Sequence, residues 1–427
     1  MLRRAIDRRS FLRVSGALAA SAALPACGDD WPPLAGGVFE VDATSAIVWA
    51  GGAPGELVEL SLFARDGGDH VLVGEARVEL AADSGTAAVA FTGLAPATPH
   101  VAKLVGPGAT GEPFAFVTAP ADDDERAVRL AWSADLDLDP AYASPILDAA
   151  IGVAPDAFVS LGDWPYADNG PVALTLADYR DRHRRARADA GTQRWMQTTN
   201  FRCIYDDHEV RNDWDLGSWA REPDRHLAGL RAWDDYFPVR TATADVRYRR
   251  WRWGAHVEAF LLDTRRHRAP LADPDVAGKT MLGDAQRAWL VAGVLASRAR
   301  YKLVFTTVPL DYGWGGDHWA AYTWERDTIL DALAAGGATG VLFLCGDSHF
   351  FASHRVGRGA REYQAGPLAR GVPDLAPFGG GELARVMTYN LGVLDVDRAG
   401  TLTVRCVDAT GATRFSETLT PADLALR

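Results

Sequence analysis

The chain has 427 residues, too long for one ordinary domain, and its length suggests two or three. Hydrophobic residues make up 48% of it and charged residues 23%, as in soluble globular proteins. The formal net charge of −12 argues against a nucleic-acid-binding groove, which needs a basic surface, and suits a protein whose carboxylates hold cations.

Residues 1–30 have the pattern of an export signal. An apolar run over residues 14–24 follows several arginines and is too short to span a bilayer. The segment Asp7-Arg8-Arg9-Ser10-Phe11-Leu12-Arg13 resembles a twin-arginine export signal. Leu24-Pro25-Ala26-Cys27 resembles a lipoprotein cleavage box, so we expect a periplasmic or cell-surface protein that meets the membrane only through a lipid on Cys27. Because proline is atypical in that box, cleavage and release is the alternative.

Residues 31–119 break into short runs of strand composition separated by turn residues. Seven such runs at this spacing are typical of a β-sandwich. Residues 91–100 resemble the turn before a late strand of fibronectin type III domains, with His100 where those domains have tyrosine. We expect a scaffolding or lid role for this domain. The expected strands are 37–41, 45–49, 56–64, 71–80, 87–91, 100–105 and 113–118.

The composition changes at residues 120–127, where a proline precedes a run of acids, and we expect a linker there. Strand and helix patterns alternate beyond it, so residues 128–427 are expected to form an α/β layered domain. The arginine-rich run 180–185 is expected on a solvated helix face. The expected strands are 128–133, 157–161, 201–205, 246–253, 256–262, 301–309, 340–345, 391–396 and 401–406, and the expected helices are 142–151, 176–188, 284–295 and 324–335.

Outside the signal the chain has three cysteines, Cys203, Cys345 and Cys406. Their odd number and irregular spacing argue against a disulfide scaffold. Cys203 and Cys345 lie within apolar strand patterns, so we interpret them as small buried hydrophobic residues rather than metal ligands.

Acids follow four of the expected strands directly. The four strand ends carry Ser133-Ala134-Asp135-Leu136-Asp137, Gly162-Asp163-Trp164-Pro165-Tyr166, Asp206-Asp207-His208-Glu209 and Gly346-Asp347-Ser348-His349. Ligands bind where the strands of an α/β sheet end. Carboxylate, imidazole and phenol groups together form a mostly hard ligand set, suited to Ca²⁺, Mg²⁺, Mn²⁺ or Fe³⁺ and poor for a thiolate zinc site. The sequence therefore predicts a metal centre, with room for two metals that share a carboxylate.

The order of these motifs resembles the alkaline phosphatase D family of metallophosphatases, in the calcineurin-like superfamily. Leu161-Gly162-Asp163, Asp206-Asp207-His208-Glu209-Val210 and Cys345-Gly346-Asp347-Ser348-His349 carry the resemblance, which extends over residues 31–410. Further matches are Asp263-Thr264-Arg265, Leu282-Gly283-Asp284 and Asp317-His318-Trp319. The resemblance implies a four-layer α/β/β/α metallophosphatase sandwich behind a fibronectin III-like β-sandwich, and hydrolysis of a phosphate ester at two or more metal ions.

The resemblance also implies roles for individual residues. Ca²⁺ and Fe³⁺ are the implied metals, with Mn²⁺, Zn²⁺ and Mg²⁺ as alternatives, and a metal-bridging hydroxide is the implied nucleophile. His208 is expected to protonate the leaving group, and Arg265 to hold a phosphate oxygen or, alternatively, to form a salt bridge. Tyr166 is either a phenolate ligand or a packed aromatic side chain. The expected metal ligands are Asp135, Asp163, Tyr166, Asp207, Asp347 and His349, and the expected catalytic residues are Asp163, His208 and Arg265.

One position departs from the family pattern. The family has a cysteine where this chain has Ala134, which puts the implied Fe³⁺ site in doubt and leaves Asp135, alone or with Asp137, as the substitute ligand. The expected substrate is a small phosphate ester or the headgroup of a lipid or polymer, and the protein is expected to act as a monomer. A phospholipase-type phosphodiesterase is one alternative. A cell-surface binding protein with impaired catalysis is another, which the missing cysteine favours.

Overall fold

The computed structural model describes residues 34–66, 68–139, 144–241, 243, 245–375, 377 and 379–427. The predicted export signal and Cys27 lie outside the described residues. No helix in the described part of the chain combines the length and the hydropathy that crossing a membrane requires.

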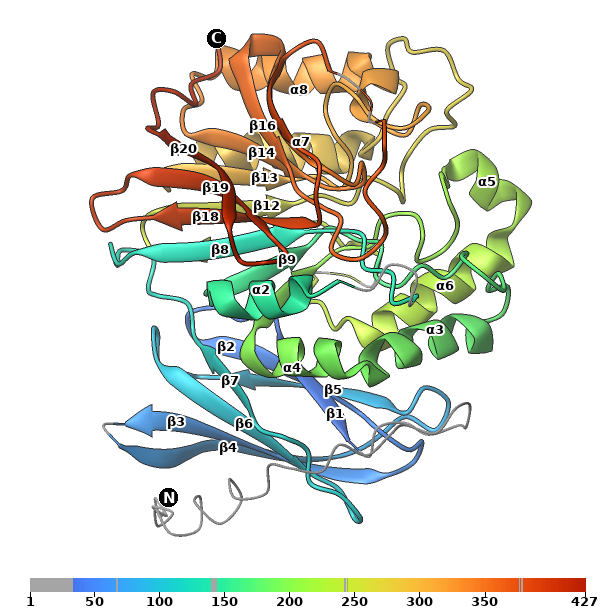
Figure 1. The fold of residues 1–427 in the computed structure, drawn as a ribbon, viewed down its shortest axis with the longest axis vertical. Coiled ribbons are helices and arrows are strands. Elements are labelled where there is room, and N and C mark those ends of the chain that lie inside the picture. Colours follow the sequence, from blue (N-terminus) through green and yellow to red (C-terminus); the bar gives the residue numbers. More distant parts are fainter. Residues whose placement is uncertain are drawn as a thin grey trace.

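Two large sheets face each other and carry helices on their outer faces (Figure 1). The nine-stranded sheet has the order β20 (Thr413–Leu419), β19 (Leu402–Asp408), β18 (Asn390–Val396), β8 (Val128–Ser133), β9 (Ala157–Ser160), β10 (Asn200–Cys203), β1 (Ala35–Phe39), β2 (Ser45–Gly51) and β5 (Thr86–Thr92). The seven-stranded sheet has the order β11 (Arg249–Trp253), β12 (Val257–Leu261), β13 (Tyr301–Phe305), β14 (Val341–Cys345), β16 (Ala360–Gln364), β15 (Phe351–Val356) and β17 (Glu382–Val386).

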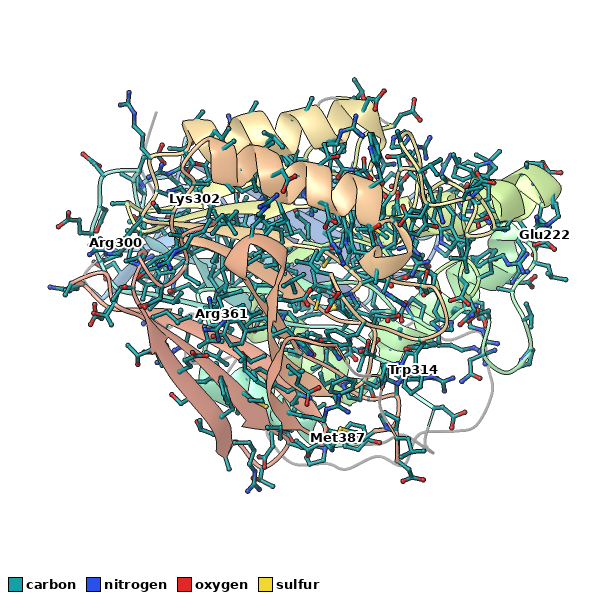
Figure 2. The ribbon with its side chains drawn as sticks, turned by 90° about the horizontal axis from the view of Figure 1, so that it is seen from above. Glu222, Arg300, Lys302, Trp314, Arg361 and Met387 are labelled. Carbon is teal, nitrogen blue, oxygen red and sulfur yellow. The ribbon has the colours of Figure 1, made fainter. Side chains whose placement is uncertain are left out.

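Three hydrophobic cores hold these layers together. The central core lies between the sheets and joins residues such as Leu130 of β8 and Leu344 of β14. The second core packs the outer face of the nine-stranded sheet against helices, and the third does the same for the seven-stranded sheet, where α7 and α8 lie side by side (Figure 2). The helices of the first set are α2 (Ile146–Val153), α3 (Leu176–Ala188), α4 (Ala190–Thr198), α5 (Leu216–Arg221) and α6 (Pro223–Tyr236), and those of the second are α7 (Gly283–Ala296) and α8 (Thr323–Ala335). The predicted mixed α/β fold is confirmed.

The N-terminal strands are divided between two sheets. Strands β1, β2 and β5 extend the nine-stranded sheet, because β1 pairs in parallel with β10. A four-stranded sheet packs against them within the same central core. Its order is β4 (Asp69–Glu79), β3 (Leu57–Asp66), β6 (Pro99–Val105) and β7 (Phe114–Val117). One sheet thus runs across the predicted linker at 120–127; the division into domains and the likeness to fibronectin type III stay predictions.

The expected strands and helices all occur, with ends shifted by a few residues. Seven further α-helices and strands were not expected: α4, α5 and α6 between residues 190 and 236, and β15, β16, β17 and β20 after residue 350. Cys203 and Cys345 are buried, as predicted, and Cys406 is buried too; all three are free.

The prediction of a solvated face for residues 180–185 is wrong in part. Helix α3 buries Arg180 and His183, and just beyond that run it buries Arg187 completely. The guanidinium carbon of Arg187 lies 4.3 Å from the ring centre of Phe237 and 5.1 Å from that of Trp164. Burial lowers the pKa of Arg187 to about 10. The aromatic side chains of the second core accept this cation through cation–π contacts, which a pattern of charges along one helix does not reveal.

A buried ion network fixes β1 to its neighbours. Glu40, directly after β1, accepts hydrogen bonds from Arg202 of β10 at 2.7 Å and from Arg249 of β11 at 2.7 Å. All three side chains are at most 6% exposed. Burial alone would raise the pKa of Glu40, but the two guanidinium groups outweigh burial and lower it below 4.5.

We predict that Glu40→Gln destabilises the protein by about 3–5 kcal/mol, because removing one partner of a buried ion pair leaves the other uncompensated. Urea denaturation measures the free energy of unfolding. Since the pKa of Glu40 is lowered in the fold, its contribution should be present above about pH 4.5 and be lost as the pH falls through the lowered value. Glu59→Gln, which removes an exposed pairing partner of Arg77, is the control and should change little.

Candidate metal centre

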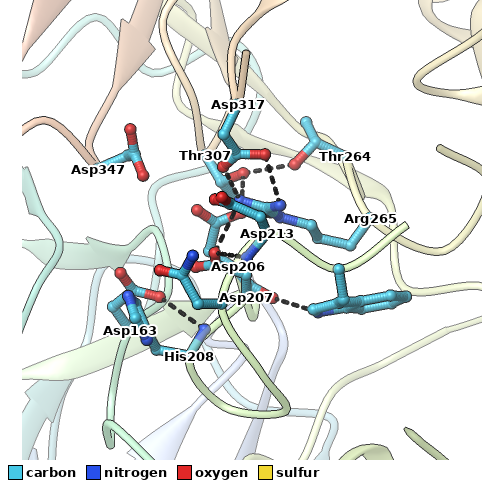
Figure 3. Close-up of polar contacts among 12 residues, drawn as sticks. Asp163, Asp206, Asp207, His208, Asp213, Thr264, Arg265, Thr307, Asp317 and Asp347 are labelled. Carbon is cyan, nitrogen blue, oxygen red and sulfur yellow. Dashed lines mark hydrogen bonds and ion pairs between the residues drawn. The ribbon is translucent and has the colours of Figure 1, made fainter. Parts of the chain in front are cut away.

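The functional side chains lie where strands of both large sheets end. Strands β8, β9 and β10 run in parallel with aligned ends, and Asp135, Asp163 and Asp207 follow them. Strand β14 of the facing sheet brings Asp347 and His349 to the same place. The four predicted strand ends therefore meet, and Figure 3 shows the carboxylates of Asp163, Asp207 and Asp347 around one space.

The backbone at these strand ends is held in an unusual conformation. Nine residues of the described chain that are not glycine have a positive φ, and five of them are at the site. Such a conformation costs energy outside glycine and tends to persist where function requires it. Gly162 has a φ of 100°, and a Cβ there would come within 2.3 Å of the Asp206 nitrogen. The five residues are Asp135, Asp163, Asp213, Asp347 and His349.

Tyr166 joins three of the predicted ligands. Its hydroxyl donates to Asp163 Oδ2 at 3.1 Å or to Asp135 Oδ1 at 3.4 Å, and lies 3.2 Å from His349 Nε2. Burial lowers the pKa of His349 to about 3, so its imidazole is neutral and able to bind a cation. These contacts bring four of the predicted ligands together, and their roles as ligands, with the phenolate role of Tyr166, stay predictions.

Further acids lie beside this group. Ligand atoms of Asp163, Asp207 and His208 lie within 4.8 Å of one another, as do those of Asp206, Asp317 and Asp347. A third group of the same size contains Asp207, Asp213 and Asp317. The carboxylates therefore form a continuous cluster that is wide enough for more than one cation.

The cluster repels itself when no cation is bound. Burial, together with the negative charges of Asp206 and Asp207, raises the pKa of Asp135 to about 8. Burial and the same two neighbours raise the pKa of Asp163 well above its ordinary value. The pKa of Asp347 is raised well above its ordinary value by burial and by the negative charges of Asp317 and Asp206.

Several oxygens of the cluster lack a hydrogen-bond donor. Asp135 Oδ2, Asp206 Oδ2 and Asp207 Oδ1 are buried and have no hydrogen-bond partner in the structure. A buried carboxylate oxygen without a donor is costly, and a cation is the partner that would satisfy it. The donor set of carboxylates, one imidazole and one phenol therefore fits hard metal ions, as predicted from the sequence.

His208 stands at the edge of this cluster and is held by an acid. Its Nδ1 lies 2.6 Å from Asp168 Oδ1, and its ring packs against that of Tyr166 with centroids 4.2 Å apart and the planes tilted by 33°. Burial lowers the pKa of His208, but the carboxylates of Asp207 and Asp168 outweigh burial and raise it to about 9. The imidazole is therefore protonated at neutral pH in this arrangement. Because Nδ1 is paired with Asp168, the proton on Nε2 is the one that remains available.

Arg265 is completely buried in an ion network above the cluster (Figure 3). Its Nε donates to Asp206 Oδ1 at 2.6 Å and its Nη1 to Asp317 Oδ1 at 2.8 Å. Arg268 pairs with the same carboxylate. Burial would raise the pKa of Asp317, but the two arginines lower it to about 2. These contacts match the salt-bridge alternative, and the phosphate contact of Arg265 stays a prediction.

The remaining predicted positions have structural surroundings. Glu209 accepts from the backbone nitrogens of Trp164 and Asp206 at 2.9 and 3.0 Å, which makes it a support of two strand ends. Ala134 is buried in the central core against Gly346, so Asp135 is the side chain that this strand end sends to the cluster. Asp137 lies beside it but pairs with Asn169 and Arg370.

Sequence reasoning left three members of the site without a role. Asp317 and Asp213 complete the acid groups, and Asp168 orients His208. Asp317 lay within a motif that carried the family resemblance, and Asp168 follows the second strand end closely. Their sequence positions could therefore have identified them as candidates for the site. Their partners could not be identified in this way, because those residues come from other parts of the chain.

The chain is similar to known phosphatases. A profile of PhoD-like phosphatases matches residues 142–372, more than half of the chain. Alkaline phosphatase D of Bacillus subtilis (strain 168) is 24% identical over 225 residues, which are 46% of this chain and 39% of that protein. The match thus spans well under half of that curated relative.

Two solved structures share the fold. A structure of PhoD superimposes with a TM-score of 0.81 at 16% identity and covers 94% of this chain and 93% of its own. Purple acid phosphatase PPD1 from yellow lupin (Lupinus luteus) seeds has a TM-score of 0.64 at 12% identity, with 92% and 75% covered. At these identities the likeness concerns the fold.

We predict that the metal-free protein loses stability as the pH rises from about 4 to about 8. The pKa of Asp135 is about 8 in the fold against 3.8 ordinarily, so the folded state binds more protons than the unfolded state within this window, and rising pH favours unfolding. Thermal unfolding of chelator-treated protein across this range measures the effect.

Asp135→Asn should weaken this pH dependence, since the amide does not titrate. Adding Ca²⁺ or Mn²⁺ at 100 times its dissociation constant should stabilise the wild type by about 2.7 kcal/mol and remove much of the dependence. A metal-free protein whose stability is flat between pH 5 and pH 8 would contradict the repulsion inferred for the cluster.

Proposed function

The chain belongs to the PhoD-like phosphatase family, as its sequence predicted, and on that premise we propose that it hydrolyses phosphate esters at a centre of two or more metal ions. The observation that carries the proposal is the set of buried carboxylate oxygens without donors at four converging strand ends. Ca²⁺ and Fe³⁺ are the metals proposed from the resemblance, with Mn²⁺, Zn²⁺ and Mg²⁺ as alternatives.

We propose that the ligands form two groups that share Asp163. Asp135, Asp163, Tyr166 and His349 would hold one ion, and Asp207 and Asp347 would complete the second site with Asp163. Bound there, the ions would supply an activated hydroxide and neutralise the charge of the phosphate. The strained backbone fixes these side chains before substrate arrives, so little reorganisation is needed.

His208 is placed to donate the proton that the leaving group needs. Asp168 holds Nδ1, so the imidazole cannot rotate freely and Nε2 carries the transferable proton. His208 keeps 18% of its side chain exposed and Asp168 12%, which leaves the imidazole accessible to a substrate. Asp168 acts here as a positioning residue for His208.

The cellular setting is proposed from the sequence. The protein would be exported by the twin-arginine route to the periplasm or cell surface and anchored by lipid at Cys27, and act as a monomer. The substrate would be a small phosphate ester or a lipid or polymer headgroup. A diesterase of the phospholipase type is the alternative within enzymes. The second alternative is a binding protein without catalysis. The acid cluster argues against it, because such a role does not explain the buried carboxylate oxygens that lack a hydrogen-bond donor.

Turnover by the metal-loaded protein tests the function. The purified chain, loaded in turn with Ca²⁺, Mn²⁺, Zn²⁺ and Fe³⁺, is expected to release the alcohol from phosphate monoesters or diesters. Asp163→Asn should lose nearly all activity, because Asp163 serves both ions. No turnover under any loading, or less than one bound ion per chain by elemental analysis, would instead favour the binding protein.

We predict that His208→Ala lowers kcat by about 10²–10⁴ for an alkyl phosphate, whose leaving group needs a proton. The loss should be smaller for p-nitrophenyl phosphate, whose leaving group departs as an anion. Asp168→Asn should show the same dependence on leaving group with a smaller loss. Equal losses on both substrates would argue against His208 as the proton donor, and steady-state kinetics with bound metal determined for each variant separates this from loss of metal.

A further inference from the structure

A loop over residues 366–371 borders the metal centre on the side of Tyr166. Ala369 donates its backbone N–H to the Asp135 carbonyl at 2.9 Å, and the Gly371 carbonyl lies 3.2 Å from His349 Nδ1. Leu136 and Ala369 form a parallel bridge. The loop residues on either side of Arg370 thus contact two predicted ligands, Asp135 and His349.

Arg370 places its charge over the site. Its guanidinium carbon lies 4.6 Å from the centre of the Tyr166 ring, whose hydroxyl contacts Asp163 and His349. Nη1 of Arg370 donates to Asp137 Oδ2 at 3.2 Å, and Asp137 is held in turn by Asn169 at 2.7 Å. Two independent contacts therefore fix the guanidinium beside the ligands.

Exposure distinguishes Arg370 from the other arginines of the site. The side chains of Arg265 and Arg268 are 0% and 2% exposed and are engaged by Asp317 and Asp206, whereas Arg370 keeps 21% of its side chain exposed. His349 and His208 keep 22% and 18%. These three side chains of the site are therefore partly open to solvent, and each has an exposed part that a substrate could contact.

We propose that Arg370 binds a terminal oxygen of the substrate phosphate and thereby selects dianionic phosphate monoesters over diesters. The proposal rests on the proposed function. A monoester has three terminal oxygens and a diester two. If two bound metal ions held two of them, the third oxygen of a monoester would need its own partner, and a guanidinium suits it. In a diester an organic substituent takes that place.

Kinetics on two esters test this assignment. We expect Arg370→Ala to lower kcat/KM for p-nitrophenyl phosphate by about 10- to 100-fold, the usual size of a charged hydrogen bond. The value for bis(p-nitrophenyl) phosphate should fall by less than about 3-fold, since its phosphate lacks the third oxygen. The inhibition constant of inorganic phosphate should rise with the loss on the monoester. On the monoester, the kcat/KM of Arg370→Lys should lie between those of the wild type and Arg370→Ala, because lysine keeps the charge and loses the planar fork.

Two controls separate binding from structure. Arg355→Ala removes an exposed arginine of β15 outside the site and should leave both esters unchanged. Bound metal is determined for every variant. Equal falls on both esters, a loss of metal in Arg370→Lys, or an unchanged inhibition constant would overturn the assignment and leave Arg370 a support of Tyr166.

The outcome for the wild type is read separately. Turnover of neither ester after metal loading would overturn the proposed function itself. Turnover of the diester alone, or turnover of both with unaltered selectivity in Arg370→Ala, would leave the metal-dependent hydrolase standing and remove only the role of Arg370.

Discussion

The ion pair between Arg265 and Asp206 joins the two facing sheets at the point where the site forms. Asp206 follows β10 and Arg265 follows β12, and both side chains are almost completely buried. Thr307, after β13, donates to the same Asp206 oxygen at 2.6 Å. A buried pair of this kind contributes little net stability but is costly to break, so it fixes geometry more than it adds free energy. The relative position of the predicted ligands depends on this registration, since they come from both sheets.

Around that pair the chain has several features that destabilise the metal-free fold but favour cation binding. Carboxylates of like charge lie side by side, several of their oxygens have no donor, and five residues adopt a backbone conformation that favours glycine. Each of these features is unfavourable in the isolated fold. Together they are what a cation-binding cluster needs, because a bound ion would neutralise the carboxylates and give their oxygens a partner, while the backbone holds them in place. The large apolar cores on both faces of each sheet supply the stability that the site does not.

Much of this arrangement could be predicted from the sequence, for a physical reason. The strands before Asp135, Asp163, Asp207 and Asp347 are short apolar runs, and an acid at the end of such a run is visible without a structure. What could not be predicted was pairing between distant side chains. The partners of Arg265 and Arg370, the aromatic surroundings of Arg187 and the parallel contact of β1 with β10 follow from the tertiary fold. Helices α4 and α6 were missed although their buried residues follow a helical period.

The parallel contact between β1 and β10 also sets an order of assembly. Glu40 and Arg202 are separated by 162 positions, so β1 cannot reach its place until β10 has been made and its own sheet has begun to form. Closing so long a loop is entropically expensive before its contacts form. The strands that are synthesised first are thus among the last to be completed, and β10 remains an open edge until they arrive. A chain shortened to residues 128–427 would keep that edge permanently and be prone to aggregation.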